Sequence, residues 1–267
     1  MKANILNLKG EKIKTIDLPI QFEEPLHPNI IKRAVQVILT NLRQKYGAKP
    51  EAGKRASAEL SRRRRKYRGS YGFGISRVPR KILWRRGRRF GWAGAFAPGT
   101  VSGRRAHPPK ASKEWSKKIN VKERRKAIRS ALSATSNKEL VIKRGHKVSI
   151  ELPIIFESKF ETISKTKEIQ SILNKLLNEE LKRSSIKKIR AGKGTRRGRK
   201  YRKKKGPLIV VSKKCPLINS AKNIPGIDIC TINLLNANLL APGTEPGRLT
   251  IFTEDSIEKL KKEELFL

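Results

Sequence analysis

Two short segments near the start of the chain alternate apolar and polar residues. Residues 3–8 (ANILNL) and residues 13–18 (IKTIDL) show this alternation, and Gly10 lies between them. A period of two residues is typical of strands, and a glycine between two such runs favours a tight turn. The sequence therefore predicts a β-hairpin at the N-terminus.

Four later segments show helical spacing. After Pro28, apolar residues recur every three or four positions from Ile31 to Leu42, and the pattern stops at Gly47. The same spacing predicts helices over residues 121–135 and 169–177, and a last helix over residues 256–265. Asp255 stands just before that last run, where an acidic residue commonly caps a helix. We therefore expect Asp255 to be the N-cap.

Short apolar runs separate these helices. Residues 149–156, 207–211, 228–234 and 249–253 are rich in Ile, Leu, Val and Phe and predict strands. Strands that alternate with helices favour a sandwich with a mostly parallel sheet. We therefore expect an α/β fold: a single globular domain with a largely parallel sheet and flanking helices.

The periodicity disappears between about Ala48 and Val121. A connection of this length without regular structure is far longer than ordinary loops, so it is expected to be disordered, functional or held by an external partner. We therefore predict a globular domain of residues 1–47 and 111–267, a long extended internal loop over residues 48–110, and a second insertion over residues 187–206.

Charge is concentrated in the loop and the insertion. The whole chain has a net charge of +42. Residues 54–110 hold 18 Lys or Arg and one acid, and residues 187–206 hold 12 Lys or Arg and no acid. Such self-repulsion destabilises a compact free state, which favours a polyanionic partner. The remaining residues resemble an ordinary, mildly basic globular domain.

The most basic stretch also contains aromatic residues and glycines. Residues 61–96 hold 13 Lys or Arg, six Gly and seven aromatic residues, with no Asp or Glu. Arginine binds phosphate through two parallel hydrogen bonds, glycine lets the backbone approach closely, and aromatic faces stack on exposed bases. A duplex-coating segment needs mainly cations, whereas folded RNA with unstacked bases uses all three. Because aliphatic residues are few, we expect the loop to become ordered only on RNA.

The predicted RNA-binding residues fall into two groups. In the loop they are Arg62, Arg63, Arg64, Arg65, Lys66, Tyr67, Arg68, Tyr71, Arg77, Arg80, Lys81, Trp84, Arg85, Arg86, Arg88, Arg89, Trp92, Arg104, Arg105, His107 and Lys110. In the second insertion they are Arg190, Lys193, Arg196, Arg197, Arg199 and Arg202. Base stacking is expected on Tyr67, Tyr71, Trp84, Phe90 and Trp92.

Signatures of other functions are weak. The glycines of residues 192–198 (GKGTRRG) do not have the spacing of a nucleotide-binding loop. His27, His107 and His146 lie far apart, and Asp17, Asp228 and Asp255 are remote from the basic segments. Cys215 and Cys230 lack zinc-site spacing, so both are expected to be buried thiols. We therefore expect no enzyme activity, metal or cofactor.

No secretory leader or membrane-spanning run is recognisable in the sequence, so we expect a cytoplasmic protein without membrane contacts.

Several ordered motifs resemble one known family. They include SRVPRK in the loop, GRRAHPPK at its exit, KERRKAIRSALSAT and RGHKVSIELPIIF after it, and RAGKGTRRGRKYRKKKGPLIVV, AKNIPG and LAPGTEPGRLTIFTEDS toward the C-terminus. The resemblance that they carry extends over nearly the whole chain. The sequence resembles the archaeal and eukaryotic branch of the universal large-subunit ribosomal protein four family.

The resemblance implies specific partners. It implies a structural role in the large ribosomal subunit, contacts with ribosomal RNA and neighbouring large-subunit proteins, and a loop whose tip lines the polypeptide exit tunnel near the nascent polypeptide. The tip is implied to be Arg77, Val78, Pro79 and Arg80. The sequence departs from the family where residues 72–76 read GFGIS, because family members commonly have a small residue followed by Gly-Arg there.

The residues themselves also allow two other interpretations of function. A basic run such as residues 62–66, taken alone, is often a solvated tail or a localisation signal. The whole chain could also be an RNA-processing or chaperone-like factor that visits the ribosome transiently. A high-salt wash of large subunits distinguishes that factor from a structural component.

Overall fold

The computed structural model describes residues 1–87 and 89–267, and the chain divides into two units. The first unit, here called the globular unit, is Met1–Leu42 together with Ser116–Leu267. The second, here called the basic unit, is Arg43–Trp115. Each is described by itself.

A six-stranded sheet forms the centre of the globular unit. Its order is β2-β1-β5-β10-β8-β9, and the neighbours from β1 to β9 are parallel while β2 pairs antiparallel with β1. The predicted N-terminal hairpin and the largely parallel sheet are both confirmed. The strands are β1 Lys2–Leu6, β2 Lys12–Asp17, β5 Ile154–Phe156, β8 Leu208–Val211, β9 Asp228–Thr231 and β10 Thr250–Thr253.

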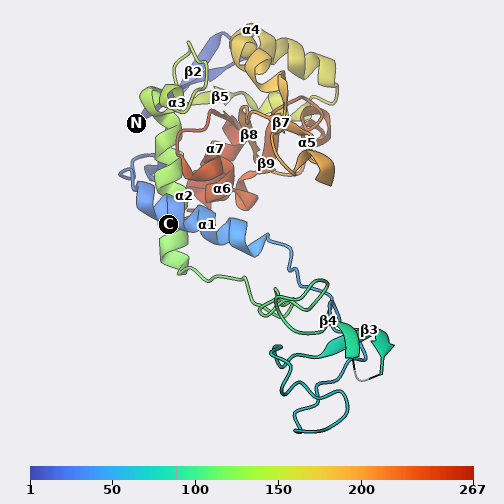
Figure 1. Cartoon of the computed structure of the whole chain (residues 1–267). Helices are drawn as coiled ribbons and strands as arrows, with labels where there is room; N and C mark the ends of the chain where they lie inside the picture. The colour runs from blue at the N-terminus through green and yellow to red at the C-terminus, as the bar shows by residue number, and fades with distance from the viewer. Residues whose placement is uncertain (88) are drawn as a thin grey trace. The chain divides into compact units, whose positions relative to one another are not determined.

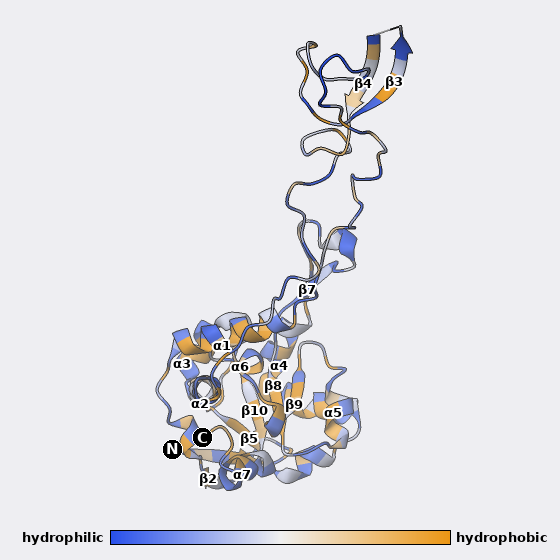
Figure 2. Cartoon of the chain, turned by 90° about the horizontal axis from the view of Figure 1, so that it is seen from below, coloured by the Kyte–Doolittle hydropathy of each residue, from blue (hydrophilic) through white to orange (hydrophobic). Residues whose placement is uncertain are grey.

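Helices cover both faces of this sheet (Figure 1). Successive strand residues point to opposite faces, so Ile155 packs with α1, α2, α6 and α7, while Ile154 packs with α3, α4 and α5. Hydrophobic residues accordingly lie on the strands and on the helix sides that face them (Figure 2). The helices are α1 Pro28–Asn41, α2 Val121–Ser136, α3 Lys138–Lys143, α4 Thr166–Ser185, α5 Pro216–Ala221, α6 Ala237–Leu240 and α7 Glu254–Lys262, with short 3-10 helices at Ile20–Phe22, Ser158–Thr162, Ile232–Leu234 and Pro242–Thr244.

The ends of some elements differ from the predictions. Helix α1 ends at Asn41 and does not continue toward Gly47, because Leu42 is 74% exposed and has no core to pack against. Strand β5 occupies only the end of residues 149–156, since Pro153 has no backbone N–H for a sheet ladder. Strand β9 stops at Thr231 and is followed by a 3-10 helix.

Asp255 is not the N-cap of the last helix, so that prediction is wrong. Thr253 is the N-cap, and its side chain and that of Ser256 form a reciprocal capping box. Asp255 instead lies in the first turn and accepts a hydrogen bond from the Ser158 hydroxyl. An acidic side chain there still interacts favourably with the helix dipole.

The basic unit contains one β-hairpin. Strand β3 Arg80–Arg86 pairs antiparallel with β4 Arg89–Gly94. The pattern of apolar residues did not predict this hairpin, because neither face of it is buried in a core. Among the described residues of this unit, Ala95 is the only fully buried hydrophobic one.

The second insertion also forms a hairpin, within the globular unit. Strands β6 Lys187–Ile189 and β7 Tyr201–Lys203 pair antiparallel, and a 3-10 helix at Thr195–Arg197 lies in the connection. Within residues 1–87 and 89–267, none of the helices is both long enough and apolar enough to span a bilayer.

Candidate nucleic-acid interface

The β3–β4 hairpin displays cations along β3 and one more, Arg89, at the start of β4. Arg80 pairs with Gly94, Lys81 with Ala93 and Arg85 with Phe90, so most cations face a small or apolar residue. Arg86 and Arg89 are opposite each other beside the turn, and both are exposed. Arg88, which was also predicted to bind RNA, lies outside the described residues.

The Trp84 ring lies directly over Gly91. A Cβ atom added to Gly91 would be 2.0 Å from the Trp84 Nε1 atom, which is far inside contact distance. Only glycine therefore permits this arrangement. Trp84 is still 58% exposed, which leaves much of the indole accessible to a base.

An aromatic cluster lies beside the hairpin. The rings of Tyr67 and Phe90 meet edge to face at 5.4 Å, and those of Phe90 and Trp92 stack at 5.3 Å. The guanidinium groups of Arg85 and Arg68 lie 5.1 Å and 5.7 Å from the centre of the Tyr67 ring. Four of the five predicted stacking residues are thus on or next to the hairpin, and part of their ring surface is already covered by neighbouring side chains.

The remaining stacking residue, Tyr71, lies among arginines. The Arg77 guanidinium is 4.5 Å from the centre of the Tyr71 ring, and that of Arg64 is 5.7 Å away. Arg80 donates from Nη2 to the Ser76 carbonyl oxygen at 3.0 Å and to its hydroxyl at 2.8 Å. These contacts connect the residue groups 62–71 and 76–80, which are separate in sequence.

The four residues assigned to the tip differ in exposure. Arg77 is exposed, whereas Val78, Pro79 and Arg80 are half-buried. The Pro79 carbonyl accepts a hydrogen bond from the Ala95 backbone at 2.8 Å, next to the end of the hairpin farthest from its turn.

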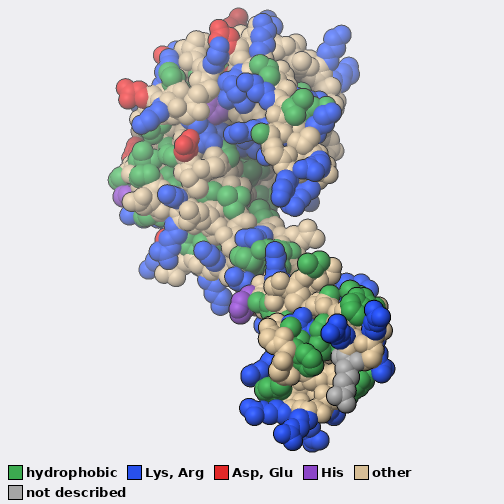
Figure 3. All heavy atoms as spheres, in the orientation of Figure 1, with side chains coloured by type: hydrophobic (Ala, Val, Ile, Leu, Met, Phe, Trp, Pro, Cys, Tyr) green, Lys and Arg blue, Asp and Glu red, His purple; other side chains and the backbone are tan. Residues whose placement is uncertain are grey.

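The loop exit carries predicted residues with few protein contacts. The Arg104 guanidinium lies 6.0 Å from the Phe96 ring centre. Arg105, His107 and Lys110 are exposed and form no ion pair within the described part of the chain. On the visible face of the basic unit, Lys and Arg side chains gather along the edges, with hydrophobic patches between them (Figure 3).

A cluster at the ends of the basic unit was missed in the sequence. Tyr46 and Trp115 stack with ring centres 6.0 Å apart, and the Arg43 guanidinium lies 3.7 Å from the Trp115 ring. The Ala48 backbone also donates to the Pro109 carbonyl at 2.9 Å. These contacts join the two ends of the segment. The available signal was one aromatic residue on each side of the predicted loop of residues 48–110.

The second hairpin places like charges opposite each other. Lys187 pairs with Lys203 and Lys188 with Arg202, an arrangement that is destabilising in a free protein. The connecting loop is folded by its own backbone, because Arg190 N donates to the Lys200 carbonyl at 2.8 Å and Arg199 N to the Gly194 carbonyl at 3.0 Å. The six predicted residues, Arg190, Lys193, Arg196, Arg197, Arg199 and Arg202, are all exposed.

Ion pairs around the buried Arg248 anchor the root of this hairpin, residues 205 and 206. Arg248, which is fully buried, donates to the Gly206 carbonyl at 3.0 Å and to the Asp228 carboxylate at 2.6 Å. Lys205 reaches the same carboxylate at 2.8 Å. Burial alone would raise the pKa of Asp228, but the hydrogen bonds from Lys205 and Arg248 lower it below its ordinary value. These contacts hold in place residues 205 and 206, which follow strand β7 and its exposed cations.

A second buried network supports the same root. Glu180 accepts from His146 at 2.7 Å and from Arg183, and Arg183 donates to the Lys205 carbonyl at 2.8 Å. Burial lowers the pKa of His146, although its hydrogen bond to Glu180 opposes the shift. His146 is therefore a structural histidine.

The two cysteines are free thiols but are only partly buried, so the prediction that both are buried is wrong. Burial raises the pKa of Cys215, and it raises that of Cys230 to about 12. Neither thiol is thus activated as a nucleophile. Within residues 1–87 and 89–267, no three His, Cys, Asp or Glu side chains are grouped as metal ligands.

An α/β fold with two exposed basic hairpins, one of them rich in aromatic residues, is typical of proteins that bind folded RNA. Comparison with known proteins makes this class specific. A model described as the ribosomal protein L4/L1 family matches residues 16–263.

Curated relatives agree over the full length. The chain is 50% identical over 268 residues to large ribosomal subunit protein uL4 of Nanoarchaeum equitans, covering 100% of both chains. It is 45% identical to the uL4 of Methanocaldococcus jannaschii, covering 98% of this chain and 99% of the relative, and 43% identical to that of Archaeoglobus fulgidus, covering 97% and 98%.

The chain belongs to the ribosomal protein L4/L1 family, in its archaeal branch. The resemblance found in the sequence motifs is thereby confirmed. The family consists of structural ribosomal proteins, which also confirms the expectation of a protein that is not an enzyme.

Proposed function

We propose that this protein is a structural component of the large ribosomal subunit that binds and connects segments of ribosomal RNA. Its two basic segments would neutralise phosphates, and its exposed aromatic rings would stack on unpaired bases. The protein would reside in cytoplasmic large subunits, beside other large-subunit proteins, and would support subunit assembly and translation. Its relatives are named as large-subunit proteins, which supports this assignment.

The observation that carries the RNA-binding proposal is the pairing of cations across the β6–β7 hairpin. Lys187 faces Lys203 and Lys188 faces Arg202, and residues 187–206 contain no acid that could relieve the repulsion. A hairpin of this kind costs free energy when alone and gains it when phosphates lie between and around the cations. The same argument applies to Arg86 and Arg89 in the basic unit.

We further propose that Arg77, Val78, Pro79 and Arg80 lie at the polypeptide exit tunnel, near the nascent polypeptide. Their position in the family motif supports this proposal. The half-buried state of Val78 and Pro79 suggests that Arg77, which is exposed, makes the outermost contact of the four.

A high-salt wash tests the structural role. Large subunits are pelleted through cushions of increasing salt concentration, and the protein remaining on the RNA is measured. We expect it to stay bound after peripheral factors have dissociated, because a segment enclosed by RNA is kinetically trapped. Ready release would contradict the structural role and favour a transient RNA-binding factor.

Matched variants make the wash specific. Replacing Arg62, Arg63 and Arg64 by Gln removes three cations from the basic unit, and each lost phosphate contact should reduce the salt dependence of binding by about one unit of slope. Replacing Lys167, Lys175 and Lys182 of α4 by Gln removes the same charge from the globular unit. This control should bind nearly as the unchanged protein does.

Crosslinking tests the tunnel proposal. A photoreactive residue is placed at Val78 in assembled ribosomes that hold a stalled, labelled nascent chain. Capture of the nascent chain is the expected result. Capture of RNA alone would contradict the tunnel position of this residue while leaving the RNA-binding proposal intact.

A further inference from the structure

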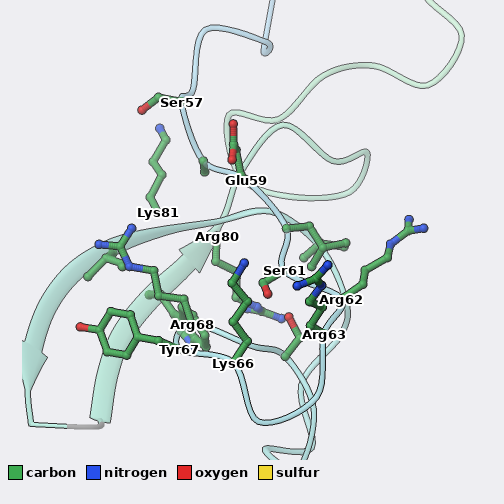
Figure 4. Close-up of a pocket in the computed structure, with 16 residues that line it drawn as sticks. Ser57, Glu59, Ser61, Arg62, Arg63, Lys66, Tyr67, Arg68, Arg80 and Lys81 are labelled. Atoms are coloured by element: carbon green, nitrogen blue, oxygen red, sulfur yellow. The ribbon is translucent and has the colours of Figure 1, made fainter.

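The basic unit contains a hollow. Binding of phosphates at the protein surface does not require such a pocket. The hollow has a volume of about 740 Å³, and it is formed by residues 57–63 and 66–68, Ser70, Val78, residues 80–82 and Trp92. This volume lies in the range of pockets that enclose one small ligand. Figure 4 shows side chains of the loop around Lys66 and of strand β3 surrounding it.

The hollow is strongly cationic. Its lining includes Arg62, Arg63, Lys66, Arg68, Arg80 and Lys81, and none of these six forms an ion pair within residues 1–87 and 89–267. The same lining has one carboxylate, that of Glu59. Cations held together without counterions raise the local concentration of anions. The pocket thus favours an anionic ligand.

The Arg80 side chain is held in one orientation before any ligand binds. Its Nη2 atom is fixed by two hydrogen bonds to Ser76, so the guanidinium group is already oriented. Its Nε atom is buried and has no hydrogen-bond partner among the described residues. An unpaired buried donor costs free energy, so a small movement of this side chain that brings Nε to the oxygen of a bound anion would be favourable.

One side of the hollow is apolar and aromatic. Tyr67, Trp92, Val78 and Ile82 belong to the lining. Inorganic phosphate would leave this wall unused, and a duplex is too wide to enter. An acidic peptide would satisfy the cations, but it would use the two rings only if it also placed an aromatic side chain beside its carboxylates. A nucleotide has both a phosphate and a planar base.

We propose that this hollow binds a single unstacked nucleotide of RNA. Its phosphate lies on Arg80 and the neighbouring cations, and its base lies against the wall that contains Tyr67 and Trp92. The Glu59 carboxylate accepts a hydrogen bond from a ribose hydroxyl or a base amino group. The inference rests on the proposed RNA-binding function and adds a particular ligand to one place in it.

Site-specific crosslinking tests the proposal. In assembled large subunits, azidophenylalanine replaces Tyr67, and the crosslinked nucleotides are mapped by reverse transcription. The matched control places the same group at Phe73, which is 63% exposed in the same unit and does not line the hollow. We expect one dominant unpaired nucleotide from position 67 and different nucleotides from position 73.

The other outcomes are distinguishable. Crosslinks from position 67 spread over several paired nucleotides would overturn the single-nucleotide site and leave only backbone contacts. Crosslinks from position 73 but none from position 67 would overturn the site and leave the proposed function intact. Absence of RNA crosslinks from both positions would overturn the proposed function as well.

Chemical probing of the mapped nucleotide gives an independent test. Trp92→Leu removes an aromatic face from the hollow, whereas Trp84→Leu removes an exposed ring that does not line it. Base–aromatic stacking is strong enough that Trp92→Leu should raise the reactivity of the mapped base on the order of tenfold. Trp84→Leu should not.

Should Trp92→Leu prevent incorporation into subunits, Lys66→Gln provides the same test from the cationic side. A smaller rise in reactivity at the same base is expected. An unchanged reactivity in both incorporated variants would contradict the site.

Discussion

The globular unit and the basic unit differ in how much apolar surface they bury. The globular unit has two buried clusters, one on each face of its sheet, and its strands β5, β8 and β10 are fully buried. In the basic unit, the described residues include a single buried hydrophobic one, Ala95. Its aromatic side chains instead contact arginines and one another.

The two units therefore depend on different sources of order, which are burial of apolar surface in one and neutralisation of charge by a partner in the other. Burial of apolar surface is the main favourable contribution to folding and does not require a partner. The basic unit lacks that contribution and carries unpaired positive charge, so its order depends on what neutralises it. The same residue types that weaken the free segment are those that bind RNA. The following variants test that contrast.

The largest effect is expected from the core of the globular unit. Phe252 is fully buried and meets Phe22 edge to face at 5.5 Å. Phe252→Ala should lower the free energy of unfolding by about 3–5 kcal/mol, as measured by denaturant titration with far-ultraviolet circular dichroism. Phe73→Ala, in the basic unit, should change it by less than about 0.5 kcal/mol. Equal losses in both variants would contradict the contrast.

A smaller effect is expected from acid. Burial lowers the pKa of His146 below its ordinary value of 6.5, so the unfolded chain binds a proton first as the pH falls. The stabilisation is complete above pH 6.5 and is lost as the pH drops from there through the lowered pKa. Unfolding free energy should therefore decrease between pH 7 and pH 5.

Variants of two histidines check the origin of this pH dependence. His146→Gln should flatten the decrease in unfolding free energy, while His107→Gln, at an exposed site of the basic unit, should leave it unchanged. Glu180 affects stability at lower pH. Burial would raise its pKa, but hydrogen bonds from His146 and Arg183 lower it below its ordinary value. Its contribution to the unfolding free energy is therefore lost only as the pH falls below about 4.5. A flattened profile in His107→Gln alone would refute the assignment.

Within the basic unit, the strongest local effect is expected at Gly91. Gly91→Ala would force the Trp84 indole away from the hairpin, at a local cost of about 1–3 kcal/mol. In assembled large subunits, where RNA orders the hairpin, chemical probing should show raised reactivity of the bases beside it. Ala93→Ser on the same strand is the control, because Ala93 is exposed and its replacement should leave that reactivity unchanged.

The smallest effect is expected from Lys188→Glu, which should stabilise the hairpin of the free protein but weaken its binding to RNA. Lys188→Glu places an acid opposite Arg202 and should stabilise the free β6–β7 hairpin by about 0.2–1 kcal/mol, visible as slower amide exchange. It should also weaken binding to ribosomal RNA. Lys193→Glu makes the same charge change outside the strands, so it should weaken RNA binding without slowing exchange. Faster exchange in Lys188→Glu would count against the charge argument.

The sequence predicted the parts of the fold that depend on a core. Apolar periodicity located the N-terminal hairpin, helices α1, α2, α4 and α7, and the strands of the parallel sheet. It overestimated β5 because Pro153 interrupts the backbone ladder, and it misassigned the last N-cap because Thr253 and Ser256 satisfy each other's backbone groups. Such local competition is decided by geometry that a pattern does not contain.

Residue composition predicted which segments form the candidate RNA interface, but it did not predict how their side chains are arranged. Clusters of Arg and Lys marked both basic segments, and aromatic residues marked the first of them. The register that places Trp84 over Gly91, the stacking of Tyr46 on Trp115 and the hollow around Arg80 depend on contacts between residues distant in sequence. The β3–β4 hairpin was missed since its strands face no core and show no alternation.

Hydrogen exchange measured on the free protein and on assembled large subunits tests most directly whether RNA orders the basic unit. We expect the amides of β5, β8 and β10 to be protected in both states. Those of Arg43–Trp115, including β3 and β4, should be protected only in the subunit. Strong protection of β3 and β4 in the free protein would contradict the account, because the unit would then hold its structure without RNA.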